Sequence, residues 1–135
     1  MKNTMLEMTR YAALARQAVA EGVVLLKNEA VLPLAPGGRA ALFGYAQFHY
    51  YKSGTGSGGL VNVTHVPNLP EILGGDGGYR LDAEVQARYA AWLADHPYEM
   101  GTGWAQEPWF QPEMPLDEEF VRAAAQRADT AFIVI

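Results

Sequence analysis

The stretch Arg39-Ala40-Ala41-Leu42-Phe43-Gly44 decides the fold of this chain. Four apolar residues follow one another here without a polar break, and a glycine comes directly after them. Unbroken apolar runs are typical of parallel strands, because helices cover both faces of a parallel sheet. We therefore predict a buried parallel strand over residues 39–43 that ends at Gly44.

A second run of the same kind, residues 131–135, is the strongest strand signal in the sequence. Helical patterns separate it from the first run, and this alternation predicts an α/β fold with a mainly parallel sheet. Two parallel strands are too few for an independent sheet. We therefore expect residues 1–135 to be the first third to two thirds of one doubly wound α/β domain, and not a complete domain.

Helical periodicity marks four segments of the chain. They cover residues 9–28, 67–73, 82–95 and 115–128, and residues 79–81 are expected to be extended. Thr9 and Asp82 are the expected N-caps of the first and third segments, because each precedes an apolar-periodic run. Gly22 lies inside the first segment, where glycine costs about 1 kcal/mol against alanine. We therefore expect close packing at Gly22.

The loop over residues 52–63 (KSGTGSGGLVNV) is the first place to look for function. Glycine loses more backbone entropy on folding than any other residue, so dense glycine favours positive φ or a close approach to a ligand. A mobile surface loop is the alternative interpretation. Gly54, Gly56 and Gly59 match a dinucleotide-binding pattern, but Val61 and its neighbours follow where that motif needs a helix.

Aromatic residues lead into this loop at positions 45, 48, 50 and 51. Such rings could line a site for a carbohydrate or a planar ligand, or they could pack the loop onto the domain. The other chemical candidates are weak. His49, His65 and His96 lack metal-ligand spacing. Ser53 and Ser57 lack a nucleophile elbow. The acidic residues are expected to be ordinary solvated side chains; they are Glu107, Glu113, Asp117, Glu118 and Glu119.

Composition excludes several classes of function. The net charge of −5 and the pI of about 5.1 argue against a general affinity for nucleic acid or anionic membranes. The absence of cysteine excludes thiolate zinc sites and cysteine nucleophiles. No window approaches the roughly 18 apolar residues of a membrane helix. No signal peptide is visible, so we expect a cytoplasmic protein if Met1 is the native start.

Several runs resemble glycoside hydrolase family 3, at the start of its α/β sandwich domain. They are ARQAVAEGVVLLKNE (15–29), LPL (32–34), YYKSGTGSGG (50–59) and ADTAFIVI (128–135). The resemblance implies part of a retaining, exo-acting β-glycosidase, most often a β-glucosidase, that acts on terminal non-reducing sugars. It implies no cofactor, and a β-glycoside substrate bound together with a barrel domain that these residues do not contain.

The same resemblance implies where the chemistry lies. Retaining enzymes use two carboxyl groups about 5 Å apart. In the family the barrel supplies the nucleophile, and in many members the acid/base glutamate follows the strand similar to residues 131–135. Neither catalytic carboxylate is therefore expected within residues 1–135, and this segment alone should be inactive.

The glycine loop resembles the family's loop over the sugar pocket, which implies a set of substrate contacts at the pocket rim. They are Lys52, Ser53, Ser57, Gly58 and Gly59. Leu60 stands where some members carry a stacking aromatic residue. The alternatives are a non-catalytic carbohydrate or protein interaction module and a nucleotide-binding α/β domain.

Overall fold

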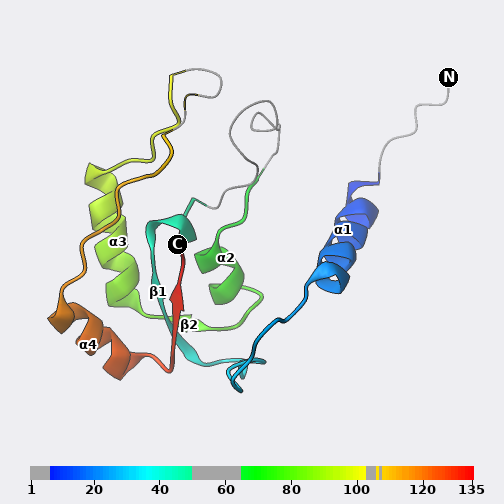
Figure 1. Cartoon of the computed structure of the whole chain (residues 1–135), viewed down its shortest axis with the longest axis horizontal. Helices are drawn as coiled ribbons and strands as arrows, with labels where there is room; N and C mark the ends of the chain where they lie inside the picture. Colours follow the sequence, from blue (N-terminus) through cyan, green and yellow to red (C-terminus); the bar gives the residue numbers. More distant parts are fainter. Residues whose placement is uncertain (1–6, 50–64, 103–105, 107) are drawn as a thin grey trace. The chain divides into compact units, whose positions relative to one another are not determined.

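The computed structural model describes residues 7–49, 65–102, 106 and 108–135 of the chain (Figure 1). It divides into two compact units, Met1–Leu34 and Ala35–Ile135. Among the described helices, none has the length and apolar character needed to cross a bilayer.

The described part of the first unit contains one helix, α1 (Met8–Gly22), which confirms the predicted helix but shortens it. Val23 is already extended, with φ −75° and ψ 127°, so the predicted continuation to residue 28 is wrong. The predicted cap is also wrong, because Glu7 precedes the helix and makes no side-chain cap. A Cβ placed on Gly22 meets no atom within 4 Å, so close packing does not explain this glycine. Its low helix propensity instead favours an end to α1 at this point.

The second unit is an α/β layer structure with a parallel sheet of strand order β2-β1-β3 in the described part of the chain. Its elements are β1 (Arg39–Phe43), the 3₁₀ turn η1 (Tyr45–Gln47), α2 (Leu69–Gly74), β2 (Arg80–Leu81), α3 (Ala83–Asp95), α4 (Glu118–Arg127) and β3 (Thr130–Ile133). The predicted strand at residues 39–43 and the predicted α/β class are confirmed. The strand predicted over residues 131–135 is observed as β3, which begins one residue earlier and ends two residues earlier than predicted.

The core lies where helices cover β1. Helices α3 and α4 both contact β1, whereas α2 contacts β2, and Figure 1 shows α2 on the other side of β1 from α3 and α4. Ala41 and Phe43 of β1 pack with Val85 and Tyr89 of α3 and with Ala124 of α4. The alternate residues of β1 are buried too, as predicted for a strand covered on both faces.

Side-chain caps fix the starts of both long helices in this unit. Asp82 accepts hydrogen bonds from the backbone of Glu84 and Val85, each at 3.0 Å, which confirms the predicted cap of α3. Asp117 accepts one from Phe120 N at 2.8 Å at the start of α4. Asp82 also receives Arg127 Nε at 2.7 Å, so one carboxylate joins the start of α3 to the end of α4.

Arg39 and Asp129 lock the beginnings of β1 and β3 together. The guanidinium Nη2 of Arg39 donates to Asp129 Oδ1 at 2.8 Å, and Arg39 N donates to Oδ2 at 3.0 Å. The backbone closes the contact in the other direction, from Asp129 N to Arg39 O at 2.9 Å. The side-chain hydrogen bond from Arg39 is the main cause that lowers the pKa of Asp129 to about 2.

This pair predicts an acid-dependent loss of stability. The folded state lowers the pKa of Asp129 from 3.8 to about 2, so the carboxylate stabilises the fold above pH 3.8 and this contribution disappears as the pH falls toward 2. We expect Asp129→Asn to lower the melting temperature at neutral pH. The difference in melting temperature from wild type should vanish as the pH falls to about 2. Thermal unfolding followed by circular dichroism across this range measures it.

Asp76→Asn is the matched control. Asp76 makes no hydrogen bond or ion pair with any residue that the structure describes, so its substitution removes a carboxylate without removing the strand contact. A melting difference for Asp129→Asn that did not depend on pH would contradict the assignment.

Gly44 generates a second prediction. Its φ is +103°, and a Cβ placed there would lie 1.9 Å from the carbonyl oxygen of Val134. Gly44→Ala must therefore combine backbone strain with a clash against backbone, and we expect a loss of about 3 kcal/mol in the free energy of unfolding. Gly37 has a similar φ of +80° but open space around its Cβ, so Gly37→Ala should cost only about 1 kcal/mol. Chemical denaturation of both variants checks the difference, and equal losses would contradict it.

Candidate functional site

The carboxyl end of β1 is the candidate site, because α/β sheets place ligands at the carboxyl ends of their strands. The ladder between β1 and β3 continues as far as the bond from Val134 N to Phe43 O, at 2.9 Å. The next two backbone N–H groups are held by side chains. Gly44 N donates to the Tyr89 hydroxyl at 2.7 Å, and Tyr45 N donates to Glu113 Oε2 at 2.6 Å.

Glu113 is therefore not the ordinary solvated residue that the sequence suggested. Its Oε1 accepts from Met114 N at 2.8 Å and from the Tyr89 hydroxyl at 3.3 Å, in addition to the bond from Tyr45 N to Oε2. The side chain remains exposed at the surface although both oxygens are engaged. An ionised carboxylate only accepts hydrogen bonds, and here three donors converge on it.

Gln47 supports the same end of β1 from inside the unit. It is fully buried, and its Nε2 donates to Leu42 O at 3.1 Å and to Gly44 O at 3.0 Å. Its Oε1 accepts from Gln86 Nε2 of α3 at 3.0 Å. Buried amides need such partners, since an unsatisfied polar group in a core costs about 1–3 kcal/mol.

Three rings lie nearly parallel beside this network. Tyr45 stacks with His49 at 5.5 Å and with Tyr98 at 6.0 Å between ring centroids, and His49 stacks with Tyr98 at 4.8 Å. Trp92 of α3 meets the edge of this group 6.2 Å from Tyr45. We call Tyr45, His49 and Tyr98 the ring cluster. Tyr45 is buried within it, Tyr98 is half-buried and His49 is exposed.

Burial shifts the pKa values of two members of the ring cluster, Tyr45 and His49. Burial, followed by the neighbouring Tyr98, raises the pKa of Tyr45 to about 12, and desolvation lowers the pKa of His49. Both groups are therefore neutral near pH 7. The Tyr45 hydroxyl is buried and has no hydrogen-bond partner within the part of the chain that the structure describes.

The aromatic residues predicted to lead into the glycine loop have different fates. Phe48 packs on the core and lies 6.0 Å from the Tyr89 ring, which fits the packing interpretation. Tyr45 is shared between the core and the ring cluster. Tyr50 and Tyr51 lie outside the described residues.

The predicted rim contacts, Lys52, Ser53, Ser57, Gly58 and Gly59, also lie outside the described residues, so they stay predictions. The glycines at positions 54, 56 and 59 and Leu60 lie outside the described residues too. Sequence reasoning missed Tyr89, Gln47 and Glu113. Tyr89 lies among apolar residues at helical spacing in the predicted helix over residues 82–95, and a tyrosine within such an apolar stripe is a signal that its hydroxyl needs a buried partner.

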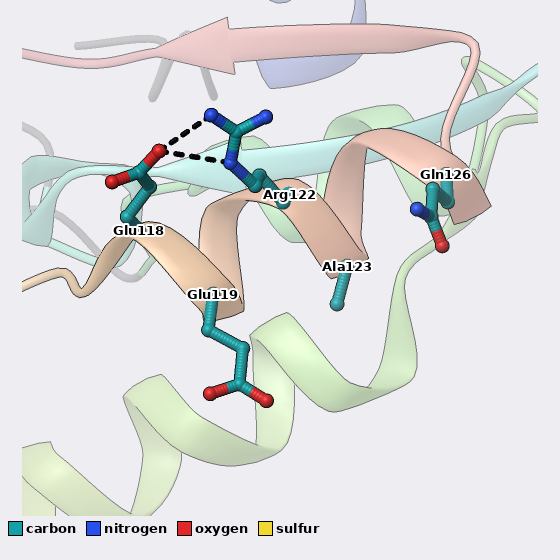
Figure 2. Close-up of a pocket in the computed structure, with 5 residues that line it drawn as sticks. All are labelled: Glu118, Glu119, Arg122, Ala123 and Gln126. Atoms are coloured by element: carbon teal, nitrogen blue, oxygen red, sulfur yellow. Dashed lines mark hydrogen bonds and ion pairs between the residues drawn. The ribbon is translucent and has the colours of Figure 1, made fainter.

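Two of the other acidic residues, Asp117 and Glu118, form ion pairs. Asp117 pairs with Arg88 Nη2 at 2.6 Å, and Glu118 pairs with Arg122 on the outer face of α4 (Figure 2). Glu119 points away from that pair in Figure 2. Glu107 lies outside the described residues.

The histidines do not form a metal centre within the described ranges. No group of three His, Cys, Asp or Glu side chains gathers there with the geometry for a metal ion. His65 pairs with Glu71 of α2 at 2.9 Å, and His96 stacks on Trp92 at 4.2 Å.

Two surface hollows lie near α4. One is lined only by side chains of α4 itself (Figure 2): Glu118, Glu119, Arg122, Ala123 and Gln126. The other is an apolar groove of about 280 Å³ between α4, β1 and β3, lined largely by alanines. Neither contains the ring cluster or the Tyr89–Glu113 contact.

Two of three comparisons with known proteins match this chain, and both match it to β-glucosidases. No family model matches the chain. Among curated proteins, it is 45% identical over 130 residues to a β-glucosidase of Ruminococcus albus, and 38% identical over 131 residues to β-glucosidase A of Butyrivibrio fibrisolvens. These matches cover 96% and 93% of this chain, but only 14% and 15% of the relatives.

Solved structures agree with the sequence relatives. A β-glucosidase from Paenibacillus barengoltzii matches 93% of this chain with a TM-score of 0.83 and 42% identity. β-Glucosidase 3B from Thermotoga neapolitana, solved in complex with glucose, matches 97% with a TM-score of 0.77 and 30% identity. The chain spans 14% and 18% of those two proteins. It is therefore homologous to one segment of the β-glucosidases.

Proposed function

We propose that this chain is part of a retaining, exo-acting β-glycosidase of glycoside hydrolase family 3, with β-glucosides as the first substrates to test. The observation that carries the proposal is the 45% identity to a β-glucosidase over almost the whole chain. The parallel α/β arrangement and its match to two solved β-glucosidases support it. Location in the cytoplasm stays a prediction.

In this proposal the segment covers the sugar pocket and the reacting carboxylates come from elsewhere in the protein. The described carboxylates support that division, because Asp82 and Asp117 cap helices and Asp129 locks two strands. Glu113 accepts hydrogen bonds from two backbone N–H groups and a tyrosine hydroxyl. A retaining mechanism instead needs two carboxyl groups about 5 Å apart on either side of the scissile bond.

The proposed substrate contacts are Lys52, Ser53, Ser57 and the backbone of Gly58 and Gly59. Their support is the family-like run YYKSGTGSGG at residues 50–59, which follows β1 and η1 directly. A glycine pair allows backbone to approach a ligand closely, and ammonium and hydroxyl groups can bind sugar hydroxyls.

The test of the proposal is hydrolysis. We expect the full-length protein that carries this segment to release nitrophenol from nitrophenyl β-D-glucoside, and the 135-residue chain alone to release none. Proton NMR of the first sugar released should show the β-anomer, because retention preserves the configuration. A full-length protein that binds glucose but cleaves no member of a nitrophenyl β-glycoside panel would support an interaction module instead.

The rim contacts give a separate prediction. Lys52→Ala in the full-length enzyme should raise KM for the glucoside roughly two- to tenfold with little change in kcat, since one hydrogen bond is worth about 0.5–1.5 kcal/mol. Lys27→Ala is the matched control, because Lys27 pairs with Glu29 on the exposed surface of the first unit. Equal kinetic constants for both variants would remove Lys52 from the site.

A further inference from the structure

Two side chains accept the backbone hydrogen bonds that follow the last bond between β1 and β3. After the bond from Val134 N to Phe43 O, the N–H groups of Gly44 and Tyr45 bond to Tyr89 of α3 and to Glu113 of the segment before α4. The carboxyl end of β1 is thus held by groups from two elements that are far apart in sequence. Removal of either group leaves a backbone N–H without its partner.

The directions of these bonds agree with one another. Gly44 N donates to the Tyr89 oxygen at 2.7 Å, so the Tyr89 hydrogen is free to be donated to Glu113 Oε1 at 3.3 Å. Burial, above all, raises the pKa of Tyr89, which keeps this hydroxyl protonated. Glu113 closes the circuit by accepting from Tyr45 N at 2.6 Å. The circuit therefore requires an acceptor-only group at position 113.

The circuit fixes the backbone from which the Tyr45 ring projects. That ring stacks on His49 and Tyr98, and its neighbour Trp92 belongs to α3, as does Tyr89. A change at Glu113 therefore acts on the ring cluster through the Tyr45 backbone. Binding surfaces must be held to within about 0.5 Å to function, so a small shift here is enough to weaken binding.

The ring cluster lies at the strand end where α/β domains place ligands, and ligand sites are mostly lined by aromatic and apolar side chains with a few polar groups. We infer that the ring cluster borders the sugar site and that Glu113, acting with Tyr89, is the positioning residue that orients it. This inference rests on the proposed function. Because both residues act on a binding surface and not on reacting atoms, they should affect KM and leave kcat nearly unchanged.

The test is steady-state kinetics of the full-length enzyme on nitrophenyl β-D-glucoside. Glu113→Gln keeps the shape but can place an amide NH₂ against Tyr45 N, and we expect KM to rise about tenfold, equivalent to about 1.4 kcal/mol, with kcat within about twofold of wild type. Glu119→Gln is the matched control, because this exposed side chain on α4 points away from the Glu118–Arg122 pair (Figure 2) and makes no hydrogen bond or ion pair with any residue that the structure describes.

Tyr89→Phe is the second variant, since it keeps the buried ring and removes only the hydroxyl. Glu113→Gln and Tyr89→Phe share a hydrogen bond, so the KM change of the double variant should be smaller than the product of the single changes. A purely structural role predicts lower melting temperatures with KM unchanged, and that result would overturn the inference alone. A wild-type enzyme that cleaves no β-glycoside would instead reject the proposed function, and the inference with it.

Discussion

The second unit depends on one constraint, the enclosure of β1 between two parallel partners. β1 pairs with β2 and β3, and helices cover it, so its backbone and side chains are satisfied only in this register. Its two ends are secured by different chemistry. At the amino end, Arg39 and Asp129 form an ion pair backed by main-chain bonds. At the carboxyl end, Tyr89 and Glu113 replace a strand partner. The strand pairing holds β1 itself, and the side chains of Tyr89 and Glu113 hold the backbone directly after it.

Local patterns predicted the elements of this unit well. The apolar run at residues 39–43 and the cap at Asp82 act through neighbouring residues, so the sequence contains enough information to identify them. The extension of α1 beyond Gly22 was wrong because apolar spacing alone does not register the change to an extended backbone at Val23. Glu113 could not be found this way either. Two of its partners, Tyr89 and Tyr45, lie 24 and 68 residues away, and only the folded sheet brings them together.

The homology and the geometry bear on different parts of the candidate site. The proposed function makes the glycine loop at residues 52–63 the sugar contact, and the structure describes the residues that precede this loop in the chain as far as His49. The buried residues at the carboxyl end of β1 are uncharged, because Gln47 is an amide and Tyr45 is neutral. The carboxylate of Glu113 lies at the surface. These properties agree with the proposed sugar ligand, which is neutral and has apolar faces.

Gly44 has a consequence for how this segment evolves. The Val134 carbonyl occupies the space that any side chain at position 44 would need. Selection against replacements there would therefore arise from the backbone that directly follows β3, and it would not depend on the ligand that the protein binds. An alignment of relatives with different substrates should keep this glycine while the neighbouring aromatic positions diverge. Invariance at position 44 would then reflect the packing of the sheet, and variation at the neighbouring aromatic positions would reflect differences in substrate.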